Sequence, residues 1–305
     1  MKIFHRHPRA DSLRIRELLI EGNKANIVAT AGLIAFGRGE AFDYLLGERT
    51  IKSAKQAIKT AAALILVAEH PVLSVNGNVA VLVPRYIAEL TKITDTKVEV
   101  NIFYRSAKRE KIIRDFLLKA GVGEVLGTEK NYQVRLDEIQ SERRIVDKRG
   151  ILKADVVLVP LEDGDRTEAL VKMGKKVIAV DLNPLSRTAQ KASVTIVDNI
   201  VRAMPLLIRY IRQLRNYRKE TLKRIINGYD NQRILKEALV HINQRLTLQR
   251  GKAPLNPQKD FFLKPGEMRS FPSSQRGKAP LNPQKDFFLK PGEMRSFPSS
   301  LAQDR

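Results

Sequence analysis

Cysteine and tryptophan are absent from the chain, and only 6% of its 305 residues are aromatic. Without cysteine there are no disulfide bonds, thiolate metal ligands or thiol nucleophiles. Because aromatic side chains are scarce, no stacking platform for nucleic-acid bases is recognisable. No apolar run reaches the roughly 20 residues of a membrane span. The N-terminal sequence MKIFHRHPRADSLRIREL is too polar for a secretory signal. We therefore expect a cytoplasmic protein with no membrane segment.

Acidic residues are outnumbered by basic ones, with 33 Asp and Glu against 55 Lys and Arg and a formal net charge of +22. Such an excess raises the local concentration of anionic partners, which include phosphorylated metabolites and nucleic acids. The basic runs RRIVDKR and RYIRQLRNYRK fit a nucleic-acid-binding protein without catalytic activity, although such runs are usually solvated helix faces. Charge alone leaves the partner open.

Hydrophobic residues make up 43% of the chain, enough for a sizeable core. Up to residue 248, helical patterns alternate with short runs of β-branched residues, which is typical of α/β layers. The expected strands are Leu73–Val75, Val98–Phe103, Glu124–Leu126, Val156–Val159, Val177–Val180 and Val194–Val197. Several are continuous apolar runs, which favour a Rossmann-like, mostly parallel sheet flanked by helices.

Helices are expected around these strands and after the last of them. An alanine-rich helix is predicted over Ile51–Ala68, with Thr50 as its N-cap. Two C-terminal helices are predicted over Ile200–Tyr217 and Lys219–Leu248. The second carries a stripe of leucine and isoleucine that fits either packing within the chain or a symmetric dimer. We favour the homodimer.

The segment 249–305 differs from the rest in composition. One sequence runs from Gln249 to Ser274 and is repeated letter for letter from Gln275 to Ser300. It is rich in Pro, Lys and Ser and has little periodicity, so it buries too little apolar surface to offset the entropy of ordering. We expect a flexible tail after a folded domain at 1–248. Docking of the tail on a partner through its Phe-Phe pairs is the alternative.

A glycine-rich stretch, AGLIAFGRGEAFDYLLGERT, occupies residues 31–50. Gly37 and Gly39 flank Arg38 and would let its guanidinium approach a phosphate without crowding. Taken alone, GRGE also fits an ordinary turn. The phosphate-binding pattern G-x-x-x-x-G-K-[ST] is missing from the chain, so a bound triphosphate would be held mainly by side-chain cations and other backbone amides.

Polar residues follow two of the expected strands, where open α/β sheets bind their ligands. Asn76 and Asn78 come after the first strand and fit either a phosphate site or the cap of the next helix. Later in the chain, Glu162, Asp163 and Asp165 crowd carboxylates beside Arg166. That arrangement suits Mg²⁺ bound through water, the amine of a substrate, or helix capping.

Three further elements converge on the same edge of the sheet. Asp181 and Asn183 end a strand, Arg187 and Thr188 lie in the following connection, and Asn199 starts a helix. This convergence favours a binding site, while the missing G-x-G-x-x-G fingerprint disfavours NAD. The four histidines form no pattern for metal or triad chemistry.

Read in order, five segments together resemble the archaeal-type phosphopantothenate synthetases, also called 4-phosphopantoate–beta-alanine ligases. They are HPR at 7–9, GLIAFGRGEAFDYLLGERT, AEHPVLSVNGNVAVLVP, ADVVLVPLEDGDRTEALVKMGK and VDLNPLSRTAQKASVTIVDNIVRA. The resemblance implies a homodimeric ligase of coenzyme A biosynthesis. Its members join 4-phosphopantoate to beta-alanine, consume ATP with Mg²⁺, and release AMP and diphosphate through an acyl-adenylate.

The resemblance also implies which residues contact the substrates. The positions matching the family's ATP contacts are Arg16, Arg38, Asp181, Leu182, Asn183, Arg187, Thr188, Asn199 and Ile200. Asn76, Asn78, Asp163, Asp165 and Arg166 are candidates for the other two substrates, and either Asp163 or Asp165 for the base that deprotonates the amine. One position departs from the family: GLIA is commonly followed there by His, whereas this chain has Phe36.

Overall fold

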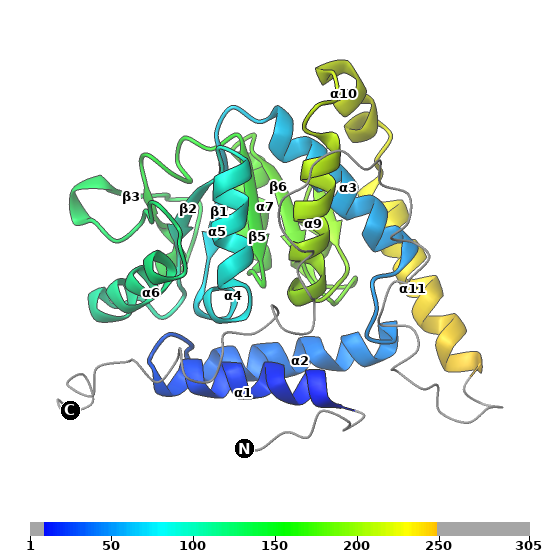
Figure 1. Ribbon diagram of the computed structural model, residues 1–305, viewed down its shortest axis with the longest axis horizontal. Coiled ribbons are helices and arrows are strands. Elements are labelled where there is room, and N and C mark those ends of the chain that lie inside the picture. The colour runs from blue at the N-terminus through cyan, green and yellow to red at the C-terminus, as the bar shows by residue number, and fades with distance from the viewer. Residues whose placement is uncertain (1–8, 249–305) are drawn as a thin grey trace, which may run out of the picture. The chain divides into compact units, whose positions relative to one another are not determined.

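A computed structural model describes residues 9–248, so the expected tail and its repeats lie outside the described residues. Five parallel strands form one sheet in the order β2-β1-β5-β6-β7 (Figure 1). Their bounds are β1 Pro71–Val75, β2 Lys97–Val100, β5 Val156–Pro160, β6 Lys176–Val180 and β7 Val194–Ile196. The predicted α/β fold with a parallel sheet is confirmed.

Both faces of the sheet are covered, which explains the continuous apolar strands. On one face, Val157 and Val177 pack in a core cluster with residues of α7 (Gly164–Lys172) and of the antiparallel pair β3 (Gln133–Arg135) and β4 (Ile145–Asp147). On the other face lie α3 (Lys52–Val67), α5 (Pro84–Ile93) and α9 (Ile200–Leu214) (Figure 1). The strands therefore contribute to two apolar layers.

Five helices complete the part around the strand ends. The helix α4 (Gly77–Leu82) follows β1, and α8 (Arg187–Lys191) follows β6, while α6 (Ala107–Lys119) follows β2. The helices α1 (Ala10–Lys24) and α2 (Thr30–Leu46) lie side by side across the end of the sheet near α4 (Figure 1). Within the described range, no helix combines the length and apolarity of a membrane span.

Two local predictions were wrong, and one pair of strands was missed. Glu124–Leu126 is not a strand, since only Leu126 forms an isolated bridge with β2. Thr50 does not cap α3, because its hydroxyl instead donates to Asp198 Oδ2 at 2.6 Å. The β3–β4 pair was not predicted, because strands of three residues with polar members carry little periodicity.

The expected helix over 219–248 is two helices, α10 (Lys219–Asn227) and α11 (Asn231–Leu248). Gly228 ends the first, and the carboxylate of Asp230 accepts hydrogen bonds from backbone amides at the start of the second. Glycine and a capping aspartate both favour a break over a continuous helix. In α11, Leu235 and Ile242 pack in a buried cluster of this same chain. They therefore give no support to the dimer that the stripe had favoured.

Candidate active site

The helix α2 contacts the carboxyl ends of β6 and β7. Leu182 follows β6, and its Cδ1 lies 3.5 Å from where a Cβ on Gly39 would stand. Asn199 follows β7, and its Nδ2 donates to Asp43 Oδ2 on α2 at 2.9 Å. Ile200, the next residue, is buried as the first residue of α9. The glycine-rich segment and these two strand ends therefore meet, as the sequence predicted.

The GRGE sequence lies inside α2 and is not a turn. Arg38 is exposed and has no hydrogen-bonded or ion-paired partner among residues 9–248. A side chain at Gly37 would meet nothing within 4 Å, so close approach does not require that glycine. At Gly32, by contrast, a Cβ would stand 2.6 Å from Asn78 Oδ1. Arg38 thus remains available for a ligand at the edge of the sheet.

Arg16 is held against α2 by an acidic residue that the sequence analysis did not single out. Its Nη2 donates to Glu40 Oε2 at 2.8 Å and to the Tyr44 hydroxyl at 3.1 Å. Burial tends to raise the pKa of Glu40, but hydrogen bonds from Arg16, Ser12 and Tyr44 bring that pKa below its ordinary value. Glu40 therefore stays ionised and orients the guanidinium.

A buried ionic group fixes the C-terminal part of α2. Arg202 Nη2 lies 2.5 Å from Asp43 Oδ1 and 2.7 Å from Asp198 Oδ1. Burial raises the pKa of Asp198, although Arg202 and Thr50 act in the opposite direction. Asn199 joins the group through Asp43 and caps α9 with its side chain. The position of α2 over β7 therefore depends on these charges.

The turn after β6 is organised by Asp181. Its Oδ1 accepts a hydrogen bond from the Asn183 amide at 2.9 Å, and its Oδ2 accepts one from the Ser186 hydroxyl at 2.5 Å. Burial raises the pKa of Asp181. Leu182 between them is buried. The carboxylate thus shapes the turn that presents Asn183.

The residues at the start of α8 face in different directions. Arg187 is exposed and donates from Nη2 to Glu168 Oε2 at 2.7 Å. Hydrogen bonds from Arg187 and Lys172 hold the pKa of Glu168 at about 2. Thr188 is buried, and its hydroxyl donates to the carbonyl of Glu162 at 2.8 Å. Thr188 therefore ties α8 to the loop after β5.

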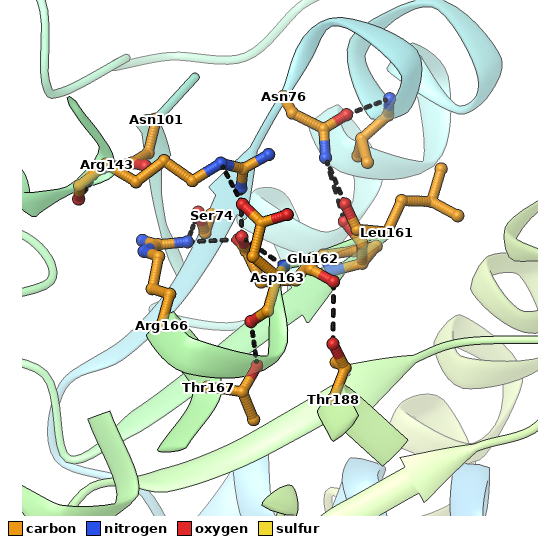
Figure 2. Close-up of polar contacts among 12 residues, drawn as sticks. Ser74, Asn76, Asn101, Arg143, Leu161, Glu162, Asp163, Arg166, Thr167 and Thr188 are labelled. Carbon is orange, nitrogen blue, oxygen red and sulfur yellow. Dashed lines mark hydrogen bonds and ion pairs between the residues drawn. The ribbon is translucent and has the colours of Figure 1, made fainter. Parts of the chain in front are cut away.

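Asn76 and Asn78 both hold backbone at the end of β1. The side chain of Asn76 caps α4, and its Nδ2 donates to the carbonyls of Pro160 and Leu161 at 3.1 Å (Figure 2). Asn78 is buried, and its Nδ2 donates to the carbonyl of Gly32 at 2.9 Å. The capping interpretation is confirmed for Asn76, which also joins the ends of β1 and β5.

The acidic turn after β5 separates three residues that are neighbours in sequence. Asp165 is exposed, while Arg166 is fully buried. Asp163 precedes α7 but makes no capping hydrogen bond, so the capping interpretation is wrong for this side chain. Burial raises the pKa of Asp163, with an opposing effect from Arg143. Asp163 and Asp165 therefore differ in their surroundings and do not form one carboxylate pair.

Glu162 is the centre of a buried ionic cluster at the ends of β1 and β5. Arg143 and Arg166 reach its carboxylate from two sides, each donating from Nη1 (Figure 2). Arg166 Nη1 also donates to the Ser74 hydroxyl at 3.1 Å. Arg143 Nε lies 3.1 Å from Asp163 Oδ2. Two guanidinium groups thus face two carboxylates in a site largely closed to solvent.

Arg143 was missed because it lies in the basic run RRIVDKR, which was interpreted as a solvated helix face. The structure corrects this. Arg143 is buried in a short 3₁₀ turn, and Asp147 of the same run is buried in β4. Spacing alone gives no signal for this contact, since Arg143 meets Glu162 only through the fold.

Comparison of the sequence with known proteins shows the family of this chain. A family described as phosphopantothenate/pantothenate synthetase matches residues 53–245. The chain is 54% identical over 242 residues to the 4-phosphopantoate--beta-alanine ligase of Thermococcus kodakarensis, covering 79% of this chain and 92% of the relative. The protein of the same name from Methanosarcina mazei is 50% identical over 242 residues, covering 79% and 94%. The chain belongs to this synthetase family. No match supports the nucleic-acid-binding alternative.

Phe36 marks a departure from the histidine expected of this synthetase family. The ring is buried in α2, with 5% of the residue exposed. A phenyl ring cannot donate or accept the hydrogen bonds of an imidazole. Any proton transfer by that histidine therefore has no counterpart at position 36.

Residues 9–248 contain no preformed cluster of metal ligands. No three His, Asp or Glu side chains in this range are placed to hold one ion. Asp163 and Asp165, which the sequence offered for Mg²⁺, differ in surroundings, with one half-buried and the other exposed.

Proposed function

We propose that this chain is an ATP-dependent 4-phosphopantoate–beta-alanine ligase of coenzyme A biosynthesis. It condenses 4-phosphopantoate with beta-alanine to 4-phosphopantothenate and releases AMP and diphosphate. The shared name of relatives at about half identity supports this assignment. The structural observation that carries it is the contact of α2 with the ends of β6 and β7, which gathers cations and amides where α/β sheets bind nucleotides.

ATP is proposed to lie along this edge. The first turn of α9 offers the positive end of a helix dipole, which favours phosphate. Cations from α1, α2 and α8 supply charge from other sides. The residues proposed to contact ATP are Arg16, Arg38, Asp181, Leu182, Asn183, Arg187, Thr188, Asn199 and Ile200.

The first reaction step brings two anions together. A carboxylate oxygen of 4-phosphopantoate forms a bond to the α-phosphorus of ATP, and diphosphate leaves. Preorganised cations stabilise the charge that spreads over the phosphoryl oxygens. Arg38 has no competing partner among residues 9–248, whereas Arg16 and Arg187 are oriented by Glu40 and Glu168. Arg38 is therefore the proposed main contact with the reacting phosphate.

The acid and the amine are proposed to lie near the ends of β1 and β5, close to Asn76, Asn78, Asp163, Asp165 and Arg166. In the second step the amine attacks the acyl carbon, the bond from that carbon to AMP breaks, and a proton leaves the nitrogen. Asp163 is better placed to accept that proton than Asp165, because burial raises the pKa of Asp163 while Asp165 is exposed.

Magnesium is proposed to enter with the nucleotide. Mg²⁺ in nucleotide sites is commonly bound by phosphate oxygens, waters and one or two carboxylates. That mode of binding needs no cluster of three protein ligands, and residues 9–248 contain none. We therefore treat Mg²⁺–ATP as the substrate.

Three broader features complete the proposal. We propose a homodimer, for which the exposed side chains of Ile34 and Leu185 beside the strand ends are candidate contacts. We place the reaction in the cytoplasm, because ATP and 4-phosphopantoate are charged metabolites that membranes retain. We assign the activity to residues 1–248, since the family match ends at residue 245.

The test is incubation of the purified full chain with Mg²⁺–ATP, 4-phosphopantoate and beta-alanine, with AMP and 4-phosphopantothenate measured by chromatography. AMP should form together with 4-phosphopantothenate only when all three substrates are present. Release of ADP, or product formation without ATP, would contradict the proposal.

A further inference from the structure

We propose that the buried cluster of Arg143, Glu162, Asp163 and Arg166 is the subsite for beta-alanine, a proposal that rests on the ligase function above. The cluster lies where the strand order reverses, because β2 pairs with one side of β1 and β5 with the other. Open α/β sheets bind ligands in the crevice outside the strand ends at this position. The nucleotide residues lie further along the same edge, after β6 and β7.

The charge of the cluster fits a zwitterion better than a phosphate. Arg143 and Arg166 supply two positive charges, and Glu162 and Asp163 supply two negative ones. A dianionic phosphate brought here would lack net positive charge, and its desolvation would go uncompensated. Beta-alanine carries one ammonium and one carboxylate, so its entry adds no net charge.

The cluster also has unused hydrogen-bonding capacity. Nε and Nη2 of Arg166 and Oδ1 of Asn101 are buried, and they have no hydrogen-bond partner in the part of the chain that the structure describes. Both residues are fully buried. Buried polar atoms are almost always paired, so several unpaired ones in one neighbourhood indicate a place for a polar ligand or water.

The backbone beside the cluster is strained. Leu161 has a φ of 54°, which is unfavourable for a leucine, and its carbonyl is held by Asn76 Nδ2. Such strain is concentrated at functional sites, where surrounding contacts enforce it. Here it sets the direction of the chain into Glu162 and Asp163.

The ion pair of Arg143 and Asp163 offers a way in for the ligand. The Asp163 side chain is 40% exposed, whereas that of Arg143 is 7% exposed. A zwitterion that enters at Asp163 exchanges one ion pair for two, with its ammonium on Asp163 and its carboxylate on Arg143. Glu162 remains between the two arginines and accepts a hydrogen bond from each of them, which fixes their positions.

The same loop touches the residues proposed for ATP. Thr188 donates to the Glu162 carbonyl, and a Cβ on Gly164 would stand 2.5 Å from Arg187 Cβ. The acceptor subsite and the nucleotide edge therefore share one short loop. This proximity is what attack of the amine on an acyl-adenylate requires.

The first experiment separates the two half-reactions. Exchange of labelled diphosphate into ATP with 4-phosphopantoate, without beta-alanine, reports adenylation alone. In Arg143→Gln and Asp163→Asn, the KM for beta-alanine should rise on the order of 30-fold, while exchange stays within about twofold of wild type. Asp163→Asn should also lower kcat of the full reaction, because Asp163 is the proposed base of the second step. Arg143→Lys, which keeps the charge, should recover part of the loss. Arg135→Lys and Asp137→Asn, at exposed positions, are the matched controls.

The second experiment tests the carboxylate end with an altered acceptor. Beta-alaninamide lacks the carboxylate, so wild type should prefer beta-alanine in kcat/KM by on the order of 100-fold. In Arg143→Gln that preference should fall to about tenfold or less. If the role of Arg143 is purely structural, Arg143→Gln would lower kcat/KM equally for beta-alanine and beta-alaninamide. The ratio of the two kcat/KM values would then stay unchanged, which would overturn the proposal.

Other outcomes are equally decisive. If the variants lose exchange and raise the KM for 4-phosphopantoate, the cluster binds the acid and the proposal is wrong. If Arg143→Gln does not fold, Asp163→Asn still decides, because the Asp163 side chain is partly exposed and makes no capping bond. A wild type without any exchange would instead contradict the ligase function itself.

Discussion

The two halves of the sheet edge differ in how many of their arginines are exposed to solvent. At β6 and β7, Arg38 and Arg187 are exposed, and only Arg187 has an acidic partner among the described residues. At β1 and β5, Arg143 and Arg166 are buried, and both are neutralised by Glu162. The first half presents two arginines to solvent beside its buried group of Arg202, Asp43 and Asp198, whereas the second half encloses its arginines with carboxylates.

This difference matches the two kinds of ligand that the reaction needs. A triphosphate is large and highly charged, so exposed cations can steer it in and stabilise its charge. A small amino acid offers few atoms, so its site has to be prepared in advance and sheltered from water. Substitutions in the two halves should therefore have different effects on stability and on substrate binding.

The largest effect on folding is expected from Glu162→Ala. The substitution leaves two buried guanidinium groups without a carboxylate between them, which should lower the free energy of unfolding by about 3–5 kcal/mol. The measurement is urea unfolding at pH 7, followed by circular dichroism. Glu168→Ala, which removes the partner of exposed Arg187, is the matched change in the other half and should leave the midpoint unchanged. Equal losses of unfolding free energy in Glu162→Ala and Glu168→Ala would contradict the difference between the two halves.

A pH effect on stability is expected from Glu99 on β2, next to the second half. Burial raises the pKa of Glu99 to about 7, although backbone amides of Ile151 and Asp147 oppose the shift. Since the folded pKa lies above the unfolded one, the stabilisation by Glu99 is complete below about pH 4.5 and is lost as the pH rises to about 7.

Glu99→Gln removes this titration. The unfolding free energy of the variant minus that of wild type should therefore increase by about 2–3 kcal/mol between pH 4.5 and pH 8. Denaturant titrations at several pH values measure the difference. The exposed Glu138→Gln serves as control. A difference that is flat with pH would show that Glu99 is ionised throughout.

A smaller effect is expected where Glu40 orients Arg16. Glu40→Gln keeps the shape but weakens the charge-assisted bonds to the guanidinium, so the KM for ATP should rise by about tenfold. Steady-state kinetics with varied ATP measure this, and the KM for beta-alanine should stay constant. Tyr44→Phe removes a single hydrogen bond to Arg16 and should change the KM for ATP by less.

The smallest effect is expected from deletion of residues 249–305. The duplicated, proline-rich composition and the end of the family match before this segment both place the activity elsewhere. The kcat and all three KM values should be those of the full chain. A large loss of turnover in the shortened protein would move part of the site into the tail.

The sequence predicts the elements whose pattern is long and apolar. The strands β1, β5, β6 and β7 were predicted because they are short, mostly apolar runs rich in valine and isoleucine. The helix α9 was predicted because Leu207, Ile208 and Ile211 recur at helical spacing. The β3–β4 pair was missed, because three-residue strands have no period to detect.

For the site, sequence found residues that follow strands and missed those that arrive from elsewhere. Asn76, Asp181 and Asn199 directly follow or lie near strand ends, so the rule for α/β sheets places them. Glu40 and Arg143 were not singled out, because their partners are 24 and 19 residues away in sequence and meet them only through the fold.

The central claim is that α2 brings Arg38 to the nucleotide edge while the acceptor binds elsewhere. It is tested most directly by diphosphate–ATP exchange with 4-phosphopantoate in Arg38→Ala, without beta-alanine. We predict a rate on the order of 100- to 1,000-fold below wild type with an unchanged melting temperature, because the exposed side chain stabilises charge and not the core. Exchange within about threefold of wild type would contradict the claim, since loss of a donor to developing charge costs far more.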